Sequence, residues 1–552
     1  ALYQAHSYHT KVPPEAITPF IEHYTKPGDV ILDPFCGSGM TGVAAAMLQR
    51  QCILSDLSPA GIHLTWNHTR PCDPEKLGST FAEIVDRLQP QFARLYRTNH
   101  TDGTSAVINW TLWSSRHRCP KCTSEFLLWE AMDRETGRLG TTVSCPRCHD
   151  QIKRSNLKSL GSEPAWISYK ANDGTRIERE PTAADIDGAL HFSRSDITDW
   201  YPNTPLSPNR EMYIRCALQL QNIKNVSDFY TNRNLRALSL IWKEIMEVKD
   251  DRIKRALAFA FTNTAWHGTR MRRFNARGGQ RPLTGTLYIP QLSIEVNVLE
   301  VMTNKIAQLK RYYTSYGQDM EYLPHLLLSN AADLSQIPDA SIDYVFTDPP
   351  FGSNIFYADC NLIWESWLGR LTDSAKEAVV NRSLSIEKGG KSLAFYSTVM
   401  ADSMREIARV LKPGGWATIV FHNTDAAVWQ AISDAASAAG FEFHTASSLD
   451  RQQQSHKGYK GRSGAEDVAH FDVVFNLRRP LLGFSSLGKA EFIDLERIVV
   501  DVASTPRYAK KGLQGVHAEV MRRLASNGAT EYLDYAAVKE IWRLHCKQQA
   551  AV

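Results

Sequence analysis

The chain has 552 residues, of which 43% are hydrophobic and 22% are charged, and its formal net charge at pH 7 is +4. The length predicts three or four folding units rather than one core, and the composition is that of an ordinary globular protein. This net charge is too small for the protein to bind a polyanion through its overall charge. A polyanionic partner would therefore have to bind to a local basic surface. No run approaches the roughly 18 apolar residues of a membrane span, and the amino-terminal stretch ALYQAHSYHTKVPPE lacks the apolar core of a signal peptide. We therefore expect a cytoplasmic protein with no membrane partner.

The first chemically informative segment is residues 29–57, DVILDPFCGSGMTGVAAAMLQRQCILSDL. A short apolar strand, a glycine-rich turn, an alanine-rich helix and a second strand follow one another here. This pattern predicts a β-α-β unit whose turn lets the backbone approach a ligand, with Asp56 placed to hold ribose hydroxyls. A protein that binds NAD or another nucleotide is the alternative. The turn lacks the third glycine of the dinucleotide pattern, however, and the chain lacks a complete phosphate-binding loop.

Four of the ten cysteines form two CxxC pairs that are separated by 22 residues. They are Cys119, Cys122, Cys145 and Cys148. Four thiolates at this spacing can surround one ion tetrahedrally, and the segment between the pairs suits a hairpin. Because all four ligands would be protein sulfurs, we expect a closed, structural zinc site. The other six cysteines are scattered, and we expect them at core or neutral positions.

A basic stretch follows, since residues 252–294 hold eight Lys or Arg residues and no acid. Five of these cations gather in HGTRMRRFNARGGQRP, namely Arg270, Arg272, Arg273, Arg277 and Arg281. Arginines on a glycine-containing backbone suit phosphate contacts, and the nearby Phe274 suits an unstacked base. A solvated basic loop is the alternative. A second basic stretch at 451–462 contributes Lys457 and Lys460, either as phosphate contacts or as part of a plain hairpin loop.

The apolar run IDYVF at 342–346 is followed directly by TDPPFGSN. Proline cannot donate to a sheet ladder, so the strand has to end here. Asp-Pro pairs often mark ordinary turns. The carboxyl end of a strand is also where open α/β sheets bind their ligands, so this segment is a second candidate for a functional site.

Taken together, DPFCGSG at 33–39 and DPPF at 348–351 resemble the S-adenosylmethionine-dependent amino-methyltransferases of nucleic acid bases, which methylate adenine N6 or cytosine N4. Further segments fit the same family in the same order, among them SYHTKVPPEAITPFIEHY, HLLLSNAADLSQIPDASIDYVF and IARVLKPGGWATIVFHN. The narrower match is to adenine-specific DNA methylases that carry a zinc ribbon. It rests on DLSPAGIHLTWNHTRP, RCPKCTSEFLLWEA, DFYTNRNLRALSLIW, RPLTGTLYIPQLSIEVNV and TDPPFGSNIFYADCNLIWESWLG.

The resemblance implies an α/β fold, with a Rossmann-like class I methyltransferase sheet. It also implies a large zinc-ribbon and helical insertion and a small helical carboxyl-terminal segment. Residues 1–72 and 321–480 are expected to form the two halves of the methyltransferase domain. Residues 73–320 are the expected insertion, which contains the zinc ribbon at about 115–150 and a helical basic region at about 205–310. Residues 481–552 are the expected carboxyl-terminal segment.

The same resemblance assigns S-adenosylmethionine as the cofactor and indicates the residues that bind it. Thr10 and Lys11 match the family's methionine-side segment, and Asp33 and Phe35 would bind the methionine side of the cofactor. The remaining cofactor residues are Gly37 and Gly39 in the turn, Asp56 at the ribose, and Ala332 and Asp333 at the adenine.

For the reaction, the family pattern indicates Asp348, Pro349, Pro350 and Phe351. An exocyclic amine is a poor nucleophile because its lone pair is delocalised into the ring. The Asp348 carboxylate and the Pro349 carbonyl would accept its two hydrogens, while Pro350 stiffens the loop and Phe351 stacks on the base. Catalysis is then mostly positioning and electrostatics, and a base in a duplex must be flipped out to reach the site.

The sequence therefore predicts a DNA methyltransferase acting on adenine N6. Cytosine N4 is the close alternative, methylation of an RNA base amine the next, and a non-catalytic scaffold that binds nucleic acid the most remote. The expected partner is DNA. Because we find no nuclease signature, cleavage in a restriction or defence system would come from another protein.

Overall fold

In a computed structural model, the chain is described for residues 5–133, 139–171, 173–276, 281–315, 322–421, 423, 425–450, 471–481, 494–527, 529 and 532–550. It divides into two compact units, each of which is discontinuous in sequence. The first unit comprises Ala1–Ser7, Pro71–Gln318 and Asp359–Leu371, and the second comprises Tyr8–Arg70, Asp319–Ala358 and Thr372–Val552. The domain boundaries expected from the sequence stay a prediction.

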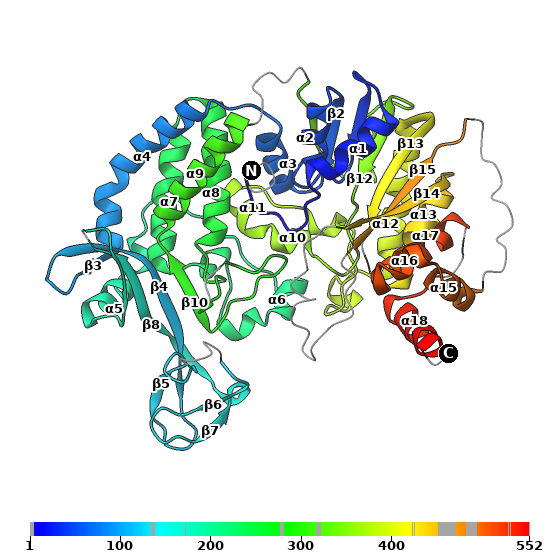
Figure 1. The fold of residues 1–552 in the computed structure, drawn as a ribbon. Coiled ribbons are helices and arrows are strands. Elements are labelled where there is room, and N and C mark those ends of the chain that lie inside the picture. Colours follow the sequence, from blue (N-terminus) through cyan, green and yellow to red (C-terminus); the bar gives the residue numbers. More distant parts are fainter. Residues whose placement is uncertain are drawn as a thin grey trace. The chain divides into compact units, whose positions relative to one another are not determined.

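The second unit is built on a seven-stranded sheet (Figure 1). Its strands are β1 (Val30–Asp33), β2 (Gln51–Asp56), β11 (His325–Leu328), β12 (Ile342–Thr347), β13 (Leu411–Phe421), β14 (Glu442–Asp450) and β15 (Phe471–Arg478). Their order across the sheet is β11-β2-β1-β12-β13-β15-β14. The first five are parallel, and β15 runs antiparallel to both of its neighbours. This is the order of a class I methyltransferase sheet, so the predicted fold class is confirmed.

The central strands are short apolar runs because both faces of the sheet are covered. Ile31 and Leu32 of β1, Leu54 of β2 and Val345 of β12 are all fully buried. The helices of this unit are α1 (Pro14–Tyr24), α2 (Met40–Met47), α3 (Pro59–His68), α12 (Leu393–Val410), α13 (Ala426–Ala438), α15 (Leu495–Ala503), α16 (Pro506–Ala509), α17 (Gly512–Ser526) and α18 (Tyr535–Ala550). The short helix α10 (Tyr357–Cys360) follows the DPPF loop.

The carboxyl-terminal helices share the hydrophobic core of this sheet. Helix α17 packs against β14 and β15, and its residues Val516, Val520, Met521 and Leu524 are fully buried in the same cluster as Ile419 of β13. The described helices from α15 onward are therefore part of the core of the second unit.

The first unit combines a mainly antiparallel sheet with a group of long helices. Its strands are β3 (Arg97–Asn99), β4 (Ser105–Arg118), β5 (Glu125–Leu127), β8 (Ser159–Lys170), β9 (Arg176–Arg179) and β10 (Leu292–Val296), and the small separate hairpin is β6 (Thr142–Ser144) with β7 (Gln151–Lys153). Its helices are α4 (Pro74–Leu95), α5 (Ala183–Leu190), α6 (Glu211–Arg215), α7 (Asn232–Glu247), α8 (Asp251–His267), α9 (Val298–Ser315) and α11 (Leu362–Leu368). Among the described helices, none is long and apolar enough to cross a membrane.

A buried ion pair ties α7 to β10 inside the first unit. The guanidinium of Arg233 contacts the carboxylate of Glu295, and both side chains are 2% exposed. The indole of Trp113 donates to the same carboxylate at 2.9 Å, and Arg233 donates to the Thr111 hydroxyl at 2.9 Å. Such a pair persists in a core only when its remaining polar groups are satisfied, as they are here.

Candidate functional site

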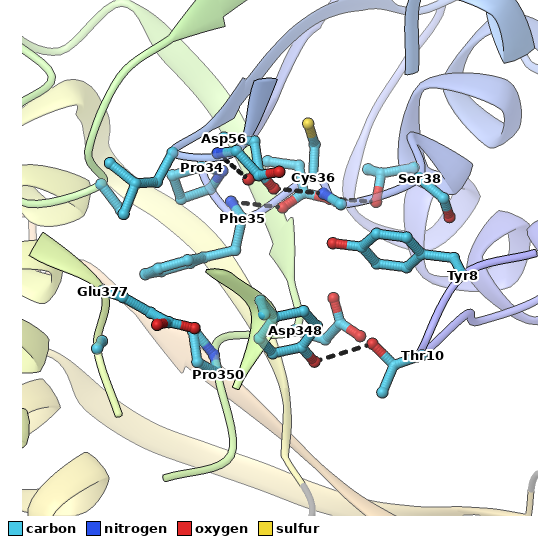
Figure 2. Close-up of a pocket in the computed structure, with 18 of the residues that line it drawn as sticks. Tyr8, Thr10, Pro34, Phe35, Cys36, Ser38, Asp56, Asp348, Pro350 and Glu377 are labelled. Carbon is cyan, nitrogen blue, oxygen red and sulfur yellow. Dashed lines mark hydrogen bonds between the residues drawn. The ribbon is translucent and has the colours of Figure 1, made fainter. Parts of the chain in front are cut away.

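A cavity in the second unit opens at the carboxyl ends of β1, β2 and β12, the edge at which open α/β sheets bind ligands. Figure 2 shows the side chains that surround it. Eight residues predicted from the sequence line this cavity: Thr10, Lys11, Asp33, Phe35, Gly37, Asp56, Asp348 and Pro350. The structure thus brings together the two motifs, which lie far apart in the chain.

The glycine turn is held to the end of β2 by Asp56. One carboxylate oxygen of Asp56 accepts from the Gly37 amide at 2.7 Å and the other from the Ser58 amide at 2.8 Å. Gly37 has φ +50°, and a Cβ there would lie 2.9 Å from the Tyr8 ring. Gly39, with φ +80°, would place a Cβ 2.8 Å from Thr65. Both positions therefore require glycine, for their backbone conformation and for close packing.

The carboxylate of Asp33 lies at the end of β1 and is satisfied by groups of the chain itself. It accepts from the Phe35 amide at 3.1 Å, from the Thr347 hydroxyl at 2.7 Å and from the Thr41 hydroxyl at 2.6 Å. Burial raises the pKa of Asp33 to about 6, although these three donors oppose the shift. Asp33 therefore joins β1, β12 and α2 at the floor of the cavity, and its contact with a cofactor stays a prediction.

The DPPF loop is fixed by its backbone carbonyls. The Tyr396 hydroxyl donates to the Pro350 carbonyl at 2.7 Å, and the Asn423 amide donates to the Phe351 carbonyl at 2.9 Å. Among the described residues, no donor is paired with the carbonyl of Pro349. Asp348 is half-buried and lines the cavity, whereas Pro349 is buried and is not among the lining residues, so the access of its carbonyl to a base stays a prediction.

Phe351 does not line the cavity. Its ring is 5% exposed and packs edge-on against Phe421, with 5.5 Å between the ring centroids and 79° between the planes. The predicted stacking of Phe351 on a base would require this ring to turn out of the core.

The loop after β11 holds the predicted adenine-end residues. Helix α12 clamps this loop, because Glu406 accepts from the Leu334 amide at 2.8 Å and Arg409 donates to the Leu334 carbonyl at 2.9 Å. Asp333 is exposed, and a hydrogen bond from Ser335 lowers the pKa of its carboxyl. The residues of this loop that line the cavity are Asn330 and Ala331, directly before Ala332 and Asp333.

The sequence motifs did not indicate three further residues of the cavity. Tyr8 and Tyr357 both line it, and their rings are stacked with centroids 6.2 Å apart. Glu377 also lines it and accepts from the Ala358 amide at 3.0 Å. Tyr8 is two residues before Thr10, and Tyr357 closely follows the DPPF motif, so their positions beside the motifs were a usable signal. The segment around Glu377 carries no motif.

The four cysteines of the first unit come together as predicted by their spacing. Their sulfur atoms all lie within 4.8 Å of one another. Thr123 and His149, each following a CxxC pair, have φ values of +62° and +60°. Their amides donate to the carbonyls of Cys119 and Cys145, in each case at 3.0 Å. Two matching turns therefore present four sulfurs to one point, a donor set that fits a structural zinc ion.

The predicted nucleic-acid contacts fall into three groups. Arg273 and Arg281 are exposed. Arg270 and Arg272 are half-buried, and burial lowers the pKa of both guanidinium groups, that of Arg272 to about 10. The Arg270 guanidinium also donates to the Asp228 carbonyl at 3.4 Å. Arg277, Lys457 and Lys460 lie outside the described residues. Arg273 and Arg281 are thus the accessible members of the described part of the cluster.

The strand order, the glycine turn with its acid and the polar loop after β12 together define a class I methyltransferase fold. Residues 3–65, which include the glycine turn, match the model of a family described as DNA methylase.

Two curated relatives each match a short part of the chain. The Type II methyltransferase M.XycI of Xanthomonas campestris pv. cyanopsidis is 42% identical over 60 residues, which is 11% of this chain and 20% of the relative. The Type II methyltransferase M.Cfr9I of Citrobacter freundii is 44% identical over 55 residues, 10% of this chain and 18% of the relative. The chain thus spans about a fifth of the length of the curated relatives that it matches. The predicted resemblance to S-adenosylmethionine-dependent DNA methyltransferases is confirmed.

Among solved structures, a candidate DNA modification methylase from Thermus thermophilus is 17% identical, covering 31% of this chain and 61% of its own, with a TM-score of 0.17. An S-adenosylmethionine-dependent methyltransferase from Methanosarcina mazei is 11% identical, covering 31% and 77%, with a TM-score of 0.18. At such TM-scores the fold assignment rests on the strand order, not on these neighbours.

Proposed function

We propose that the protein is a DNA methyltransferase that transfers a methyl group from S-adenosylmethionine to an exocyclic base amine, with adenine N6 as the first candidate. The observation that carries this proposal is that Asp348 and the glycine turn with Asp56 line one cavity. A reacting amine at Asp348 and a cofactor at the turn would therefore be close together, as in-line transfer requires.

The residues around the turn fit the cofactor. The backbone at Gly37 approaches the cavity without a side chain, and Asp56 retains acceptor capacity beyond its bonds to the Gly37 and Ser58 amides. We assign Asp56 to the ribose, Thr10 and Lys11 to the methionine end and the loop at Ala332 and Asp333 to the adenine. The bound cofactor supplies an electrophilic methyl group on a positively charged sulfur.

The activation of the amine is assigned to the DPPF loop. The Asp348 carboxylate and the Pro349 carbonyl accept the two amine hydrogens, which draws the nitrogen toward tetrahedral geometry and frees its lone pair. Positive charge develops on this nitrogen during transfer, and a fixed carboxylate stabilises that charge without reorganisation. The hydrogen bonds from Tyr396 and Asn423 fix the carbonyls of Pro350 and Phe351, the two residues that follow these acceptors.

DNA is the proposed partner, with the target base flipped out of the duplex. The exposed Arg273 and Arg281 are proposed to contact phosphates. Cytosine N4 is the second candidate for the target, because the same two acceptors suit either amine and the matched family does not separate the two. Association with other proteins of a restriction or defence system is part of the proposal, and a zinc ion at the four cysteines would hold the ribbon together.

The test is transfer of a radiolabelled methyl group from S-adenosylmethionine into unmethylated bacterial DNA, followed by mass spectrometry of the nucleosides. We expect N6-methyladenine. N4-methylcytosine would replace the base assignment while keeping the reaction. Label that enters RNA alone, or no label in any nucleic acid, would reject the proposed function.

A further inference from the structure

Two tyrosine rings line the cavity that contains the proposed acceptor Asp348. Tyr8 and Tyr357 line the same cavity as Asp348 and stack at 6.2 Å with 28° between their planes. The hydroxyls of Tyr357 and Thr10 form a hydrogen bond of 3.1 Å. In Figure 2, Tyr8 and Thr10 lie together on one side of Asp348, opposite Glu377. The cavity therefore has an aromatic wall next to the acid.

Contacts with Gly37 and Thr10 fix the positions of the two tyrosine rings. The Tyr8 ring packs directly on Gly37, where even a Cβ would approach it to 2.9 Å. Tyr8 thus spaces Tyr357 away from the glycine turn, while the bond to Thr10 fixes the Tyr357 ring in its plane. Burial, followed by the charge of Asp56, raises the pKa of the Tyr8 phenol above its usual value. Tyr8 is therefore neutral at physiological pH and adds no charge to the wall.

The ring that the sequence motif offered for stacking is engaged elsewhere. Phe351 is 5% exposed, its ring packs on Phe421, and its carbonyl is held by Asn423. Tyr357 already lines the cavity that contains Asp348, whereas contact between a base in this cavity and Phe351 would first require the Phe351 ring to leave the core.

We propose that Tyr357, backed by Tyr8 and oriented by Thr10, is the surface on which the target base lies while Asp348 holds its amine. This inference rests on the proposed function for the identity of the ligand. Every base has a π-face, so an aromatic ring binds adenine or cytosine alike, and the polar acceptors give direction rather than affinity. Tyr357 would then be a base-stacking residue rather than an acceptor of the amine protons.

The test compares Tyr357→Leu with Tyr357→Phe, which keeps the ring and removes the hydroxyl that bonds to Thr10. Tyr508→Leu, in α16 and outside the residues that line the cavity, is the matched control. Stacking on one base is worth about 5- to 150-fold in affinity. We expect Tyr357→Leu to lower kcat/KM for DNA by about that factor, and Tyr357→Phe and the control to stay within about threefold of wild type. Calorimetry should find the affinity for S-adenosylhomocysteine unchanged in all three.

A second measurement needs neither a recognition site nor catalysis. With S-adenosylhomocysteine at saturation, saturation-transfer NMR should detect binding of 9-methyladenine or 1-methylcytosine to the wild-type protein and to Tyr357→Phe, but not to Tyr357→Leu. This separates two failures. Base binding through Tyr357 without any methyl transfer would reject the proposed function and support the stacking role of Tyr357. Full methyl-transfer activity in Tyr357→Leu would support the proposed function and reject the stacking role.

Three further results would overturn the inference. An equal loss in Tyr357→Phe and Tyr357→Leu would assign the effect to the hydroxyl, and a parallel loss of S-adenosylhomocysteine affinity would assign the rings to the cofactor. Loss of base binding in Phe351→Leu at unchanged thermal stability, with Tyr357→Leu unaffected, would return the stacking role to Phe351.

Discussion

Asp33 at the end of β1 and Thr347 at the end of β12 are joined by a hydrogen bond of 2.7 Å, although they are 314 residues apart in the chain. The glycine turn begins directly after Asp33, and the DPPF loop begins directly after Thr347. One buried contact therefore sets the starting points of the two segments that are proposed to hold the cofactor and the target base.

The first prediction concerns the buried carboxyl of Asp33, whose pKa is raised to about 6 from an ordinary value of 3.8. Between these pH values the folded state binds a proton that the unfolded state lacks, so this group's contribution to the free energy of unfolding falls as pH rises from about 4 to 6. Asp33→Asn removes the titration and keeps the hydrogen bonds, because Thr41 can accept from the amide. Relative to this variant, wild type should lose about 2 kcal/mol between pH 4 and pH 7.

The measurement is urea denaturation of both proteins across that pH range. Equal pH dependence of the two proteins would show that Asp33 has an ordinary pKa.

The second prediction concerns the four cysteines. Cys119→Ser together with Cys145→Ser should abolish zinc binding and lower solubility, since a closed thiolate site contributes folding free energy. Elemental analysis should find one zinc ion per chain in wild type and none in the double variant. Cys546→Ser, at an exposed cysteine, is the control and should keep the metal. Wild type purified without chelator and free of zinc would contradict the assignment.

The third prediction separates cofactor binding from chemistry at Asp348. Asp348→Ala should leave cofactor affinity nearly unchanged, because the turn at Gly37 and Asp56 belongs to other strands. Methyl transfer should fall by at least about 10²–10³, the usual cost of losing a positioned charge-stabilising contact. Single-turnover methylation and calorimetry with S-adenosylmethionine measure the two effects. Near-normal methylation by the variant would reject the proposed activation of the amine.

The fourth prediction concerns the basic cluster of the first unit. Replacing the exposed Arg273 and Arg281 by Gln should weaken DNA binding across all sequences and reduce the slope of log K against log salt by about 2. Fluorescence anisotropy titrations at several salt concentrations give both quantities. Replacing the half-buried Arg270 should instead lower thermal stability, because its guanidinium donates to the Asp228 carbonyl. An unchanged slope in the Arg273/Arg281 variant would show that these arginines lie in a solvated loop and do not contact phosphates.

The sequence was informative wherever function constrains the backbone itself. Gly37 and Gly39 need glycine because of positive φ and close packing, and the prolines after Asp348 have to end a strand, so these positions are visible as motifs. Side-chain directions are set by distant packing partners instead. That Phe351 turns toward Phe421, and that Arg270 and Arg272 are half-buried, follows from contacts that no local pattern records.

The same reason explains the cavity residues that the motifs did not indicate. Tyr8 and Tyr357 become neighbours only when β1 and β12 pair, and Glu377 reaches the cavity from a segment of no recognisable pattern. Strand order could be predicted because the motifs occur in the family's order along the chain, even with a large insertion between them.

The separation of β1 and β12 along the chain has a consequence for biosynthesis. At ribosomal rates, roughly 15 to 60 s pass between the synthesis of Asp33 and that of Thr347. During this time β1 and β2 have no β12 beside them, and their apolar residues have no sheet in which to be buried. Most of the first unit, by contrast, is one continuous stretch, Pro71–Gln318, that is complete before β12 is made. The nascent chain therefore contains an incomplete sheet, β1 and β2, during the whole time in which Pro71–Gln318 is synthesised. We expect chaperones to bind the apolar residues of these two strands.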